Sequence, residues 1–390
     1  MKPNIQYIQT NAELATVVET LLKKKEIFID LEFDKNHFRY GFNLCLMQVF
    51  DGENCFLIDP LDGIEIELIF PVLENPDIAL VCFAFNEDMR LLHHLGARPN
   101  NIVDLGVAMR LLDFETLSLN NSILAVLGED YPIDTKGSQQ KSNWFQRPLT
   151  EQQHKYAAED VLHLPAVKKV LMQNLEEINR EEWFAEEMEA FEKHDWSGGE
   201  KVAYLTKKDQ KTMTLREWIR FEKLMDYREE LGASLKRPTY KVWDKKIALL
   251  LAKTPAKVKE WKTLKGIHPK LRVDKVQQNV EALLALAEKE ITEHKIAENQ
   301  SSIPALTKEK RLKINQQRTR IQAAKERFFL PIKEELKKEI GENYSNFFLS
   351  NRKMTEFATG EQVLLPYQKK MIQNTANKLS LELPSFMMGK

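Results

Sequence analysis

The segment Ile27–Phe33 places the strongest constraint on how this chain can fold, because two carboxylates stand inside an apolar run. Its β-branched and aromatic residues predict a strand, whose side chains alternate between the two faces of a sheet. Asp30 and Glu32 would then share one face, roughly 7 Å apart. Two acids on a buried face raise each other's pKa, so the pair favours a bound cation. Oxygen ligands alone suit Mg²⁺ or Mn²⁺ better than zinc. The alternative is an edge strand with solvated acids.

Two further segments supply residues that could join this pair. Thr150 and Gln153 have the spacing of a capping box, which predicts a helix start, and Tyr156 and Asp160 then share one face of that helix. Elsewhere an apolar strand runs into a polar turn, and Asp88 follows at the start of a helix, where the helix dipole favours a carboxylate. Four acids and a tyrosine from three distant segments are therefore candidates for one site.

The order and spacing of these motifs resemble the DEDD superfamily of 3′→5′ exonucleases, in its tyrosine-containing branch. The segments Leu57–Leu61 and Lys141–Leu149 also look like ribonuclease D. The resemblance runs from about residue 27 to about residue 170. It implies a chain that is α/β plus all-α: an RNase H-like mixed-sheet exonuclease domain followed by one or two helical-bundle HRDC-type domains.

The resemblance also implies a role for each site residue. Asp30, Glu32, Asp88 and Asp160 would hold two divalent cations, Mg²⁺ or Mn²⁺. Tyr156, one helical turn before Asp160, would orient the attacking water. The chain departs from the family pattern at positions 31, 34 and 86, where it has Leu, Asp and Asn. None of these departures removes a carboxylate, so they concern substrate contacts and leave the chemistry intact.

Nucleic-acid contacts are expected mainly in the polar segment Asp134–Arg147, which the resemblance associates with phosphate binding and in which Trp144 would pack the loop down. A second place is the turn around Gly266, whose backbone N–H groups and neighbouring lysines could meet phosphate; an ordinary helix connection is the alternative. The predicted nucleic-acid-binding residues are Asn86, Lys136, Gln140, Lys141, Trp144, Arg147, Lys265 and Lys270.

Length and charge divide the chain. Its 390 residues predict two or three domains. Residues 1–200 hold 17 of the 57 Lys and Arg residues and 35 of the 58 Asp and Glu residues, so the remainder is strongly basic. An acidic part joined to a basic part favours an enzyme that acts on a polyanion, with the reaction in one part of the chain and substrate binding in the other. The alternative is that the charges lie on solvated helix faces. The expected domains are 1–195, the exonuclease; 208–292, an HRDC-type helical domain; and 303–385, a second, diverged HRDC-like helical domain.

Three cysteines without metal-site spacing, and the lack of a signal segment or a run of transmembrane length, predict a cytoplasmic protein. The predicted function is a metal-dependent 3′→5′ exoribonuclease. It would release nucleoside 5′-monophosphates from RNA 3′ ends, with structured precursors such as tRNA as the expected partners. Two alternatives remain open at this point: a DNA 3′→5′ exonuclease in repair, and a catalytically inactive RNA-binding adaptor.

Overall fold

The predicted strand is β2 (Glu26–Lys35), an inner strand of a six-stranded sheet in the computed structural model. The structure describes residues 4–116, 118–133, 139–197 and 205–383. Two compact units are formed. The first contains residues 1–32, 44–198 and 308–390, and the second contains residues 33–43 and 199–307.

The sheet of the first unit is mixed, as the resemblance implies. Its strand order is β1-β4-β3-β2-β5-β6. β1 runs parallel to β4, β3 runs antiparallel to β4, and β5 runs parallel to both β2 and β6. The other strands are β1 (Asn4–Ile8), β3 (Phe42–Phe50), β4 (Asn54–Ile58), β5 (Ala79–Cys82) and β6 (Ile102–Asp104).

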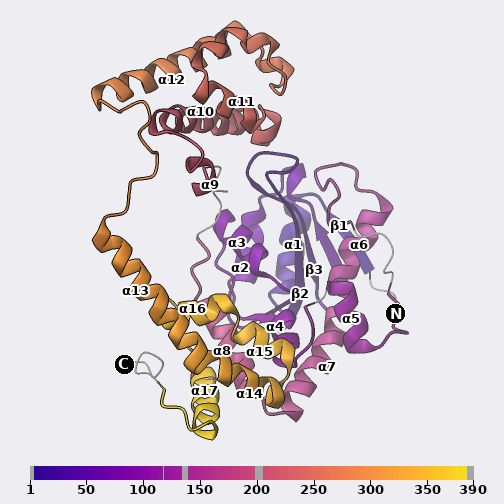
Figure 1. Ribbon diagram of the computed structural model, residues 1–390. Helices are drawn as coiled ribbons and strands as arrows, with labels where there is room; N and C mark the ends of the chain where they lie inside the picture. Colours follow the sequence, from indigo (N-terminus) through magenta and orange to yellow (C-terminus); the bar gives the residue numbers. More distant parts are fainter. Residues whose placement is uncertain (1–3, 117, 134–138, 198–204, 384–390) are drawn as a thin grey trace. The chain divides into compact units, whose positions relative to one another are not determined.

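The apolar composition of β2 follows from its inner position. Ile27, Phe28 and Ile29 are at most 2 % exposed, because neighbouring strands and covering helices enclose this part of the strand on both faces. The helices of this region, visible around the sheet in Figure 1, are α1 (Asn11–Leu21), α2 (Phe70–Leu73), α3 (Asn86–Leu95), α4 (Leu105–Leu111), α5 (Leu119–Leu127), α6 (Glu151–Leu162), α7 (Leu164–Glu177) and α8 (Glu181–Glu192).

The last helices of the chain complete the first unit. α15 packs on α4 and α17 packs on α8 (Figure 1). Phe329, Ile332 and Phe348 belong to the same buried cluster as Leu105 and Val161 of the sheet domain. Residues 308–383 therefore share a core with the sheet domain, and an HRDC-like origin for them stays a prediction. The helices are α13 (Lys308–Ala324), α14 (Leu330–Ile340), α15 (Glu342–Phe348), α16 (Asn351–Thr359) and α17 (Pro366–Lys378).

The second unit is helical and has its own core. Phe221, Trp243 and Trp261 are at most 1 % exposed and lie in one cluster. The Nε of the buried Arg228 donates to the carbonyls of Thr239 and Trp243, at 3.0 and 2.9 Å. Its main elements are α9 (Lys207–Gln210), α10 (Leu215–Ser234), α11 (Lys245–Lys253), the 3₁₀ segment η4 (Pro255–Thr263) and α12 (Asp274–Glu293). In the described parts of both units, no helix combines the length and apolar character needed to cross a bilayer.

Candidate metal and catalytic site

Asp30 and Glu32 of β2 lie close together, and Asp160 of α6 joins them. One carboxylate oxygen from each of the three residues lies within 4.8 Å of the others. The alternation of the strand explains the pairing, because Ile29 and Leu31, on either side of Asp30, point to the opposite face and are buried. A third acid, 128 residues further along the chain than Glu32, completes a triad.

Asp88 stands next to this triad. It lies in the first turn of α3 and is 8 % exposed. Burial raises the pKa of Asp88, and the charge of Asp30 raises it further. Burial also raises the pKa of Glu32, and the charges of Asp30, Asp160 and Asp88 add to this shift. The structure therefore brings all four predicted acids into one electrostatically coupled group, with Asp88 outside the tight triad.

Burial and mutual repulsion make these carboxyl groups reluctant to ionise. Burial raises the pKa of Asp30 to about 7. Burial also raises the pKa values of Glu32 and Asp160, and neighbouring carboxylates raise them further. Within the described ranges, the ion pairs give none of the four a lysine or arginine partner. Full ionisation of the group would thus leave its negative charge uncompensated within the described residues.

A hard divalent cation fits this arrangement. The donors are carboxylate oxygens only, which suit Mg²⁺ or Mn²⁺ and offer no soft ligand to zinc or copper. A cation among them would replace repulsion with attraction and so lower the cost of keeping buried carboxylates ionised.

The start of α6 is fixed by the predicted capping box. The backbone N–H of Gln153 donates to Thr150 Oγ1, and the backbone N–H of Thr150 donates to Gln153 Oε1, at 3.2 and 3.1 Å. Ala157 and Ala158 are at most 1 % exposed, so small side chains let the helix lie close to its neighbours. The half-buried Tyr156 lies one turn before Asp160.

A buried acid positions α3. Asp104 accepts hydrogen bonds from the backbone N–H groups of Ala84 and Phe85, at 2.8 and 3.0 Å, immediately before α3 begins. Asp104 also caps α4, by accepting from the N–H of Gly106 at 2.8 Å. A Cβ on Gly106 would stand 3.2 Å from the Ala84 nitrogen, so glycine allows this close approach. Asp104 is about 20 residues from Ala84 and Phe85, so no local sequence pattern reveals its contact with the turn that leads to Asp88.

Comparison with known proteins assigns this region. Residues 5–176 match the family described as "3'-5' exonuclease". Residues 5–176 are a 3′–5′ exonuclease domain. Ribonuclease D from Shewanella sp. (strain ANA-3) is 31 % identical over 186 residues, which cover 47 % of each chain. Ribonuclease D from Escherichia coli (strain K12) is 31 % identical over 170 residues, covering 43 % of this chain and 44 % of that one.

The match to these relatives spans about half the length of each. The fold extends further than the sequence similarity. The crystal structure of Escherichia coli RNase D aligns with a TM-score of 0.66 and 20 % identity, over 96 % of this chain and 99 % of that one. The predicted combination of a mixed-sheet exonuclease domain and a following helical region is therefore confirmed.

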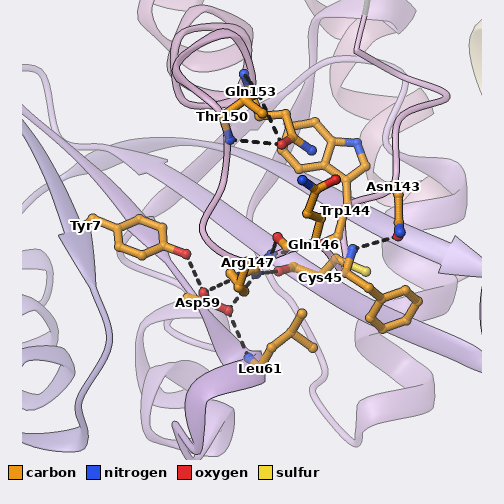
Figure 2. Close-up of polar contacts among 11 residues, drawn as sticks. Tyr7, Cys45, Asp59, Leu61, Asn143, Trp144, Gln146, Arg147, Thr150 and Gln153 are labelled. Carbon is orange, nitrogen blue, oxygen red and sulfur yellow. Dashed lines mark hydrogen bonds and ion pairs between the residues drawn. The ribbon is translucent and has the colours of Figure 1, made fainter.

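The contacts of Arg147 in the exonuclease domain correct its predicted role in nucleic-acid binding. Its guanidinium group binds Asp59 through Nε and through Nη2, the latter at 2.7 Å (Figure 2). The remaining N–H groups donate to the carbonyls of Cys45, Trp144 and Gln146, at 2.7–2.8 Å. All five donors are thus used inside the protein, so Arg147 has none left for a phosphate in this arrangement.

The Asp59–Arg147 pair instead fastens the segment before α6 to the sheet. Asp59 follows β4, its side chain is fully buried, and it also accepts from Tyr7 Oη and from the N–H of Leu61 at 2.9 Å (Figure 2). These hydrogen bonds and the guanidinium charge hold the pKa of Asp59 below its ordinary value despite its burial. In the sequence, Asp59 stands out only as part of the segment Leu57–Leu61, which resembles ribonuclease D. Its partner stands 88 residues away, which no local pattern reveals.

Trp144 lies in the protein interior, at 2 % exposure, and its ring centroid is 6.2 Å from that of Tyr156. The expectation that it packs the loop down agrees with this position. Its assignment as a nucleic-acid-binding residue is corrected, because a ring with almost no exposed surface cannot stack on a base.

The other predicted nucleic-acid contacts lie at the surface or outside the described residues. Asn86 is exposed at the start of α3, and Gln140 and Lys141 are exposed before Trp144. Lys136 falls outside the described residues. Lys265 and Lys270 are exposed in the second unit. Their contacts with nucleic acid stay predictions.

Proposed function

We propose that this chain is a divalent-metal-dependent 3′→5′ exoribonuclease that removes nucleoside 5′-monophosphates from RNA 3′ ends. The observation that carries the proposal is the group of four carboxylates, three buried and Asp30 half-buried, within a 3′–5′ exonuclease domain. Structured precursors such as tRNA are the proposed substrates, because the similar chains are named ribonuclease D. The cytoplasm is the proposed location, since Cys45, Cys55 and Cys82 are buried free thiols.

The carboxylates would divide the work of holding cations. Asp30, Glu32 and Asp160 would hold one ion, because their oxygens lie nearest one another. Asp30 and Asp88 would share a second. When bound, such ions acidify water and offset negative charge on the leaving 3′ oxygen.

Tyr156 would position the attacking water. A phenol with an ordinary pKa near 10 is a weak base, so its part is to accept or donate a hydrogen bond and thereby align the water with the scissile phosphate. The Trp144 ring beside Tyr156, fixed by the Asp59–Arg147 pair through the Trp144 carbonyl, limits where the phenol can go. Orientation of this kind is worth more than proton abstraction by so weak a base.

The test measures release of mononucleotides from 3′-labelled RNA and from DNA of the same sequence, with Mn²⁺ and with a chelator. The wild-type protein should act on RNA, only with the metal, and Asp160→Asn should lose this activity while keeping RNA affinity within about twofold in a filter-binding assay, because the change removes a ligand and no basic residue. Preference for DNA would support the repair exonuclease instead. RNA binding without hydrolysis by the wild type would support the inactive adaptor.

A further inference from the structure

A groove of about 770 Å³ lies in the first unit, and its lining includes none of the four acids. α3 and α4 contribute Asn86, Arg90 and Arg110 to its walls. The end of α8 and the C-terminal helices α15 and α16 contribute the rest, among them Phe347 and Lys353. Figure 1 shows α4, α8, α15 and α16 gathered in one region. The groove therefore exists only because the C-terminal helices pack on the exonuclease domain.

Two cations in this groove share one aromatic ring. The Lys353 nitrogen lies 3.8 Å from the centroid of the Phe347 ring, and the Arg110 guanidinium carbon lies 4.7 Å from it. Burial lowers the pKa of Lys353; the charge of Glu187 acts in the opposite direction, and the charge of Arg110 lowers the pKa again. Like charges held this close together in partly buried positions favour an anion between or beside them.

Buried donors point to the same conclusion. The Nε atoms of Arg90 and Arg110 are buried and have no hydrogen-bond partner among the described residues. An unpaired buried N–H of a guanidinium group is costly, and a side-chain rotation that turned it toward the groove would let a ligand oxygen satisfy it.

The acids of the groove have other partners. Glu187 accepts hydrogen bonds from Tyr367 Oη and, at 3.0 Å, from Gln368 Nε2. Glu356 pairs with Arg352 at 2.6 Å, and Glu361 is exposed. In the described ranges, the ion pairs include neither Arg110 nor Lys353; Arg90 pairs with Glu87 through Nη1 at 2.9 Å. Arg110 and Lys353 thus form no ion pair with the acids of the groove among the described residues.

The position of the groove relates it to the carboxylates. Asn86 and Arg90 are four residues apart on α3 and line the groove, while Asp88 between them belongs to the acidic group. An α-helix with its side chains is about 10–12 Å across, so the groove wall formed by Asn86 and Arg90 lies within roughly that distance of Asp88.

We propose that this groove binds phosphate groups of the RNA backbone upstream of the 3′ end that lies at the carboxylates. The proposal rests on the function proposed above. Arg110 and Lys353 would contact the phosphates, and Asn86 and Arg90 would connect this contact to the catalytic side of α3. Phosphate fits because guanidinium and ammonium groups are its usual protein ligands, and because such contacts require no base sequence.

The test compares a substrate that reaches the groove with one that does not. Single-stranded RNA of roughly 20 nucleotides exceeds the span of a single-strand site, whereas the p-nitrophenyl ester of thymidine 5′-monophosphate has no upstream phosphate. Arg110→Gln and Lys353→Gln should each raise KM for the RNA about tenfold and leave kcat/KM for the ester within about twofold. Lys353→Arg should restore the KM for the RNA.

Salt dependence gives a readout that a purely structural defect would not move. Each lost phosphate contact should reduce the slope of log Kd against log salt by about 0.7 for single-stranded RNA. Lys23→Gln removes the same charge from an exposed lysine elsewhere in the first unit and should change neither slope nor KM.

Three outcomes would overturn the proposal. Lys23→Gln and Lys353→Gln could change the KM for RNA equally, or Lys353→Gln could lower kcat/KM equally for RNA and for the ester. In the third outcome, adenosine 5′-monophosphate inhibits Lys353→Gln more weakly than the wild type while the KM for RNA is unchanged. The last would assign the groove to the released nucleotide. Failure of the proposed function is recognised separately, because the wild type would then hydrolyse neither substrate. In that case the RNA affinity of Asp160→Asn is compared with that of the double variant Asp160→Asn, Lys353→Gln. A lower affinity of the double variant would still show that the groove binds RNA.

Discussion

Each acid of the four-carboxylate group is destabilising by itself, because burial and its neighbours oppose its ionisation. Asp160→Asn should therefore raise Tm in the presence of a chelator. Mn²⁺ should raise the Tm of the wild type and hardly that of the variant, since binding to the folded state alone is stabilising. Thermal melts followed by circular dichroism measure both effects, and Asp77→Asn, an exposed acid, should behave as wild type. A lower Tm of Asp160→Asn in chelator, with an unchanged response to Mn²⁺, would contradict this.

Asp30 gives the site a pH dependence of definite sign. Its pKa rises from 3.8 to about 7, so the folded protein binds more protons than the unfolded chain between these values. This group therefore makes the metal-free protein less stable as pH rises through that window. Metal binding requires the ionised form, so Mn²⁺ affinity should rise about tenfold between about pH 6 and about pH 8. Calorimetric titration at the two pH values measures this, and equal affinities would show that Asp30 is ionised at both.

The Asp59–Arg147 pair should contribute strongly to stability because removing one partner leaves a buried charge. Asp59→Asn should lower the free energy of unfolding by about 3–5 kcal/mol. The exposed pair of Lys193 and Glu189 is the matched control, and Glu189→Gln should cost at most about 0.5 kcal/mol. Urea unfolding of both variants measures the difference. Similar losses of unfolding free energy for Asp59→Asn and Glu189→Gln would mean that the Asp59–Arg147 pair behaves as a solvated ion pair.

At the scale of elements, α1 and α6 begin with the same capping box, formed by Thr10 and Glu13 in one and by Thr150 and Gln153 in the other. Thr10→Ala and Thr150→Ala should each lower stability by about 1 kcal/mol. Only Thr150→Ala should also reduce kcat, because α6 carries Tyr156 and Asp160. Parallel urea unfolding and exonuclease assays separate the two effects. If Thr10→Ala lost as much activity as Thr150→Ala, the loss in both variants would result from lower stability alone.

Local patterns were sufficient for much of the site. The period of two in β2 predicts that Asp30 and Glu32 share a face, and the capping-box spacing predicts where α6 starts; both depend on residues only a few positions apart. Arg147 and Trp144 could not be assigned in this way. A basic residue in a polar segment has the same local signature whether it binds phosphate or a buried acid 88 residues away, and only the tertiary contact decides between them.

At the scale of the molecule, residues 308–390 are part of the first unit, which the sequence did not indicate. The amphipathic spacing of α14–α17 predicts helices but not the surface against which they pack. The basic excess is divided accordingly: residues 201–307 hold 23 basic and 14 acidic residues, and residues 308–390 hold 17 and 9. Attachment to RNA through positive charge is thus available on both units.

Deletion of residues 308–390 should destabilise the exonuclease domain. Phe329, Ile332 and Phe348 are at most 1 % exposed and would leave apolar surface of the domain uncovered. The truncated protein should expose hydrophobic surface to a fluorescent dye and be digested by trypsin within the domain at least tenfold faster than the full chain. Equal digestion rates would show that the domain is stable alone.

The joining of α17 to α8 has a consequence for biosynthesis. The backbone N–H of Tyr367 donates to Glu186, 181 residues earlier, at 2.9 Å. At translation rates of about 5–20 residues per second, this partner leaves the ribosome roughly 10–40 s after Glu186. During that interval the nascent domain presents an apolar face that a chaperone could cover, and residues 199–307 of the second unit are synthesised before that face is closed.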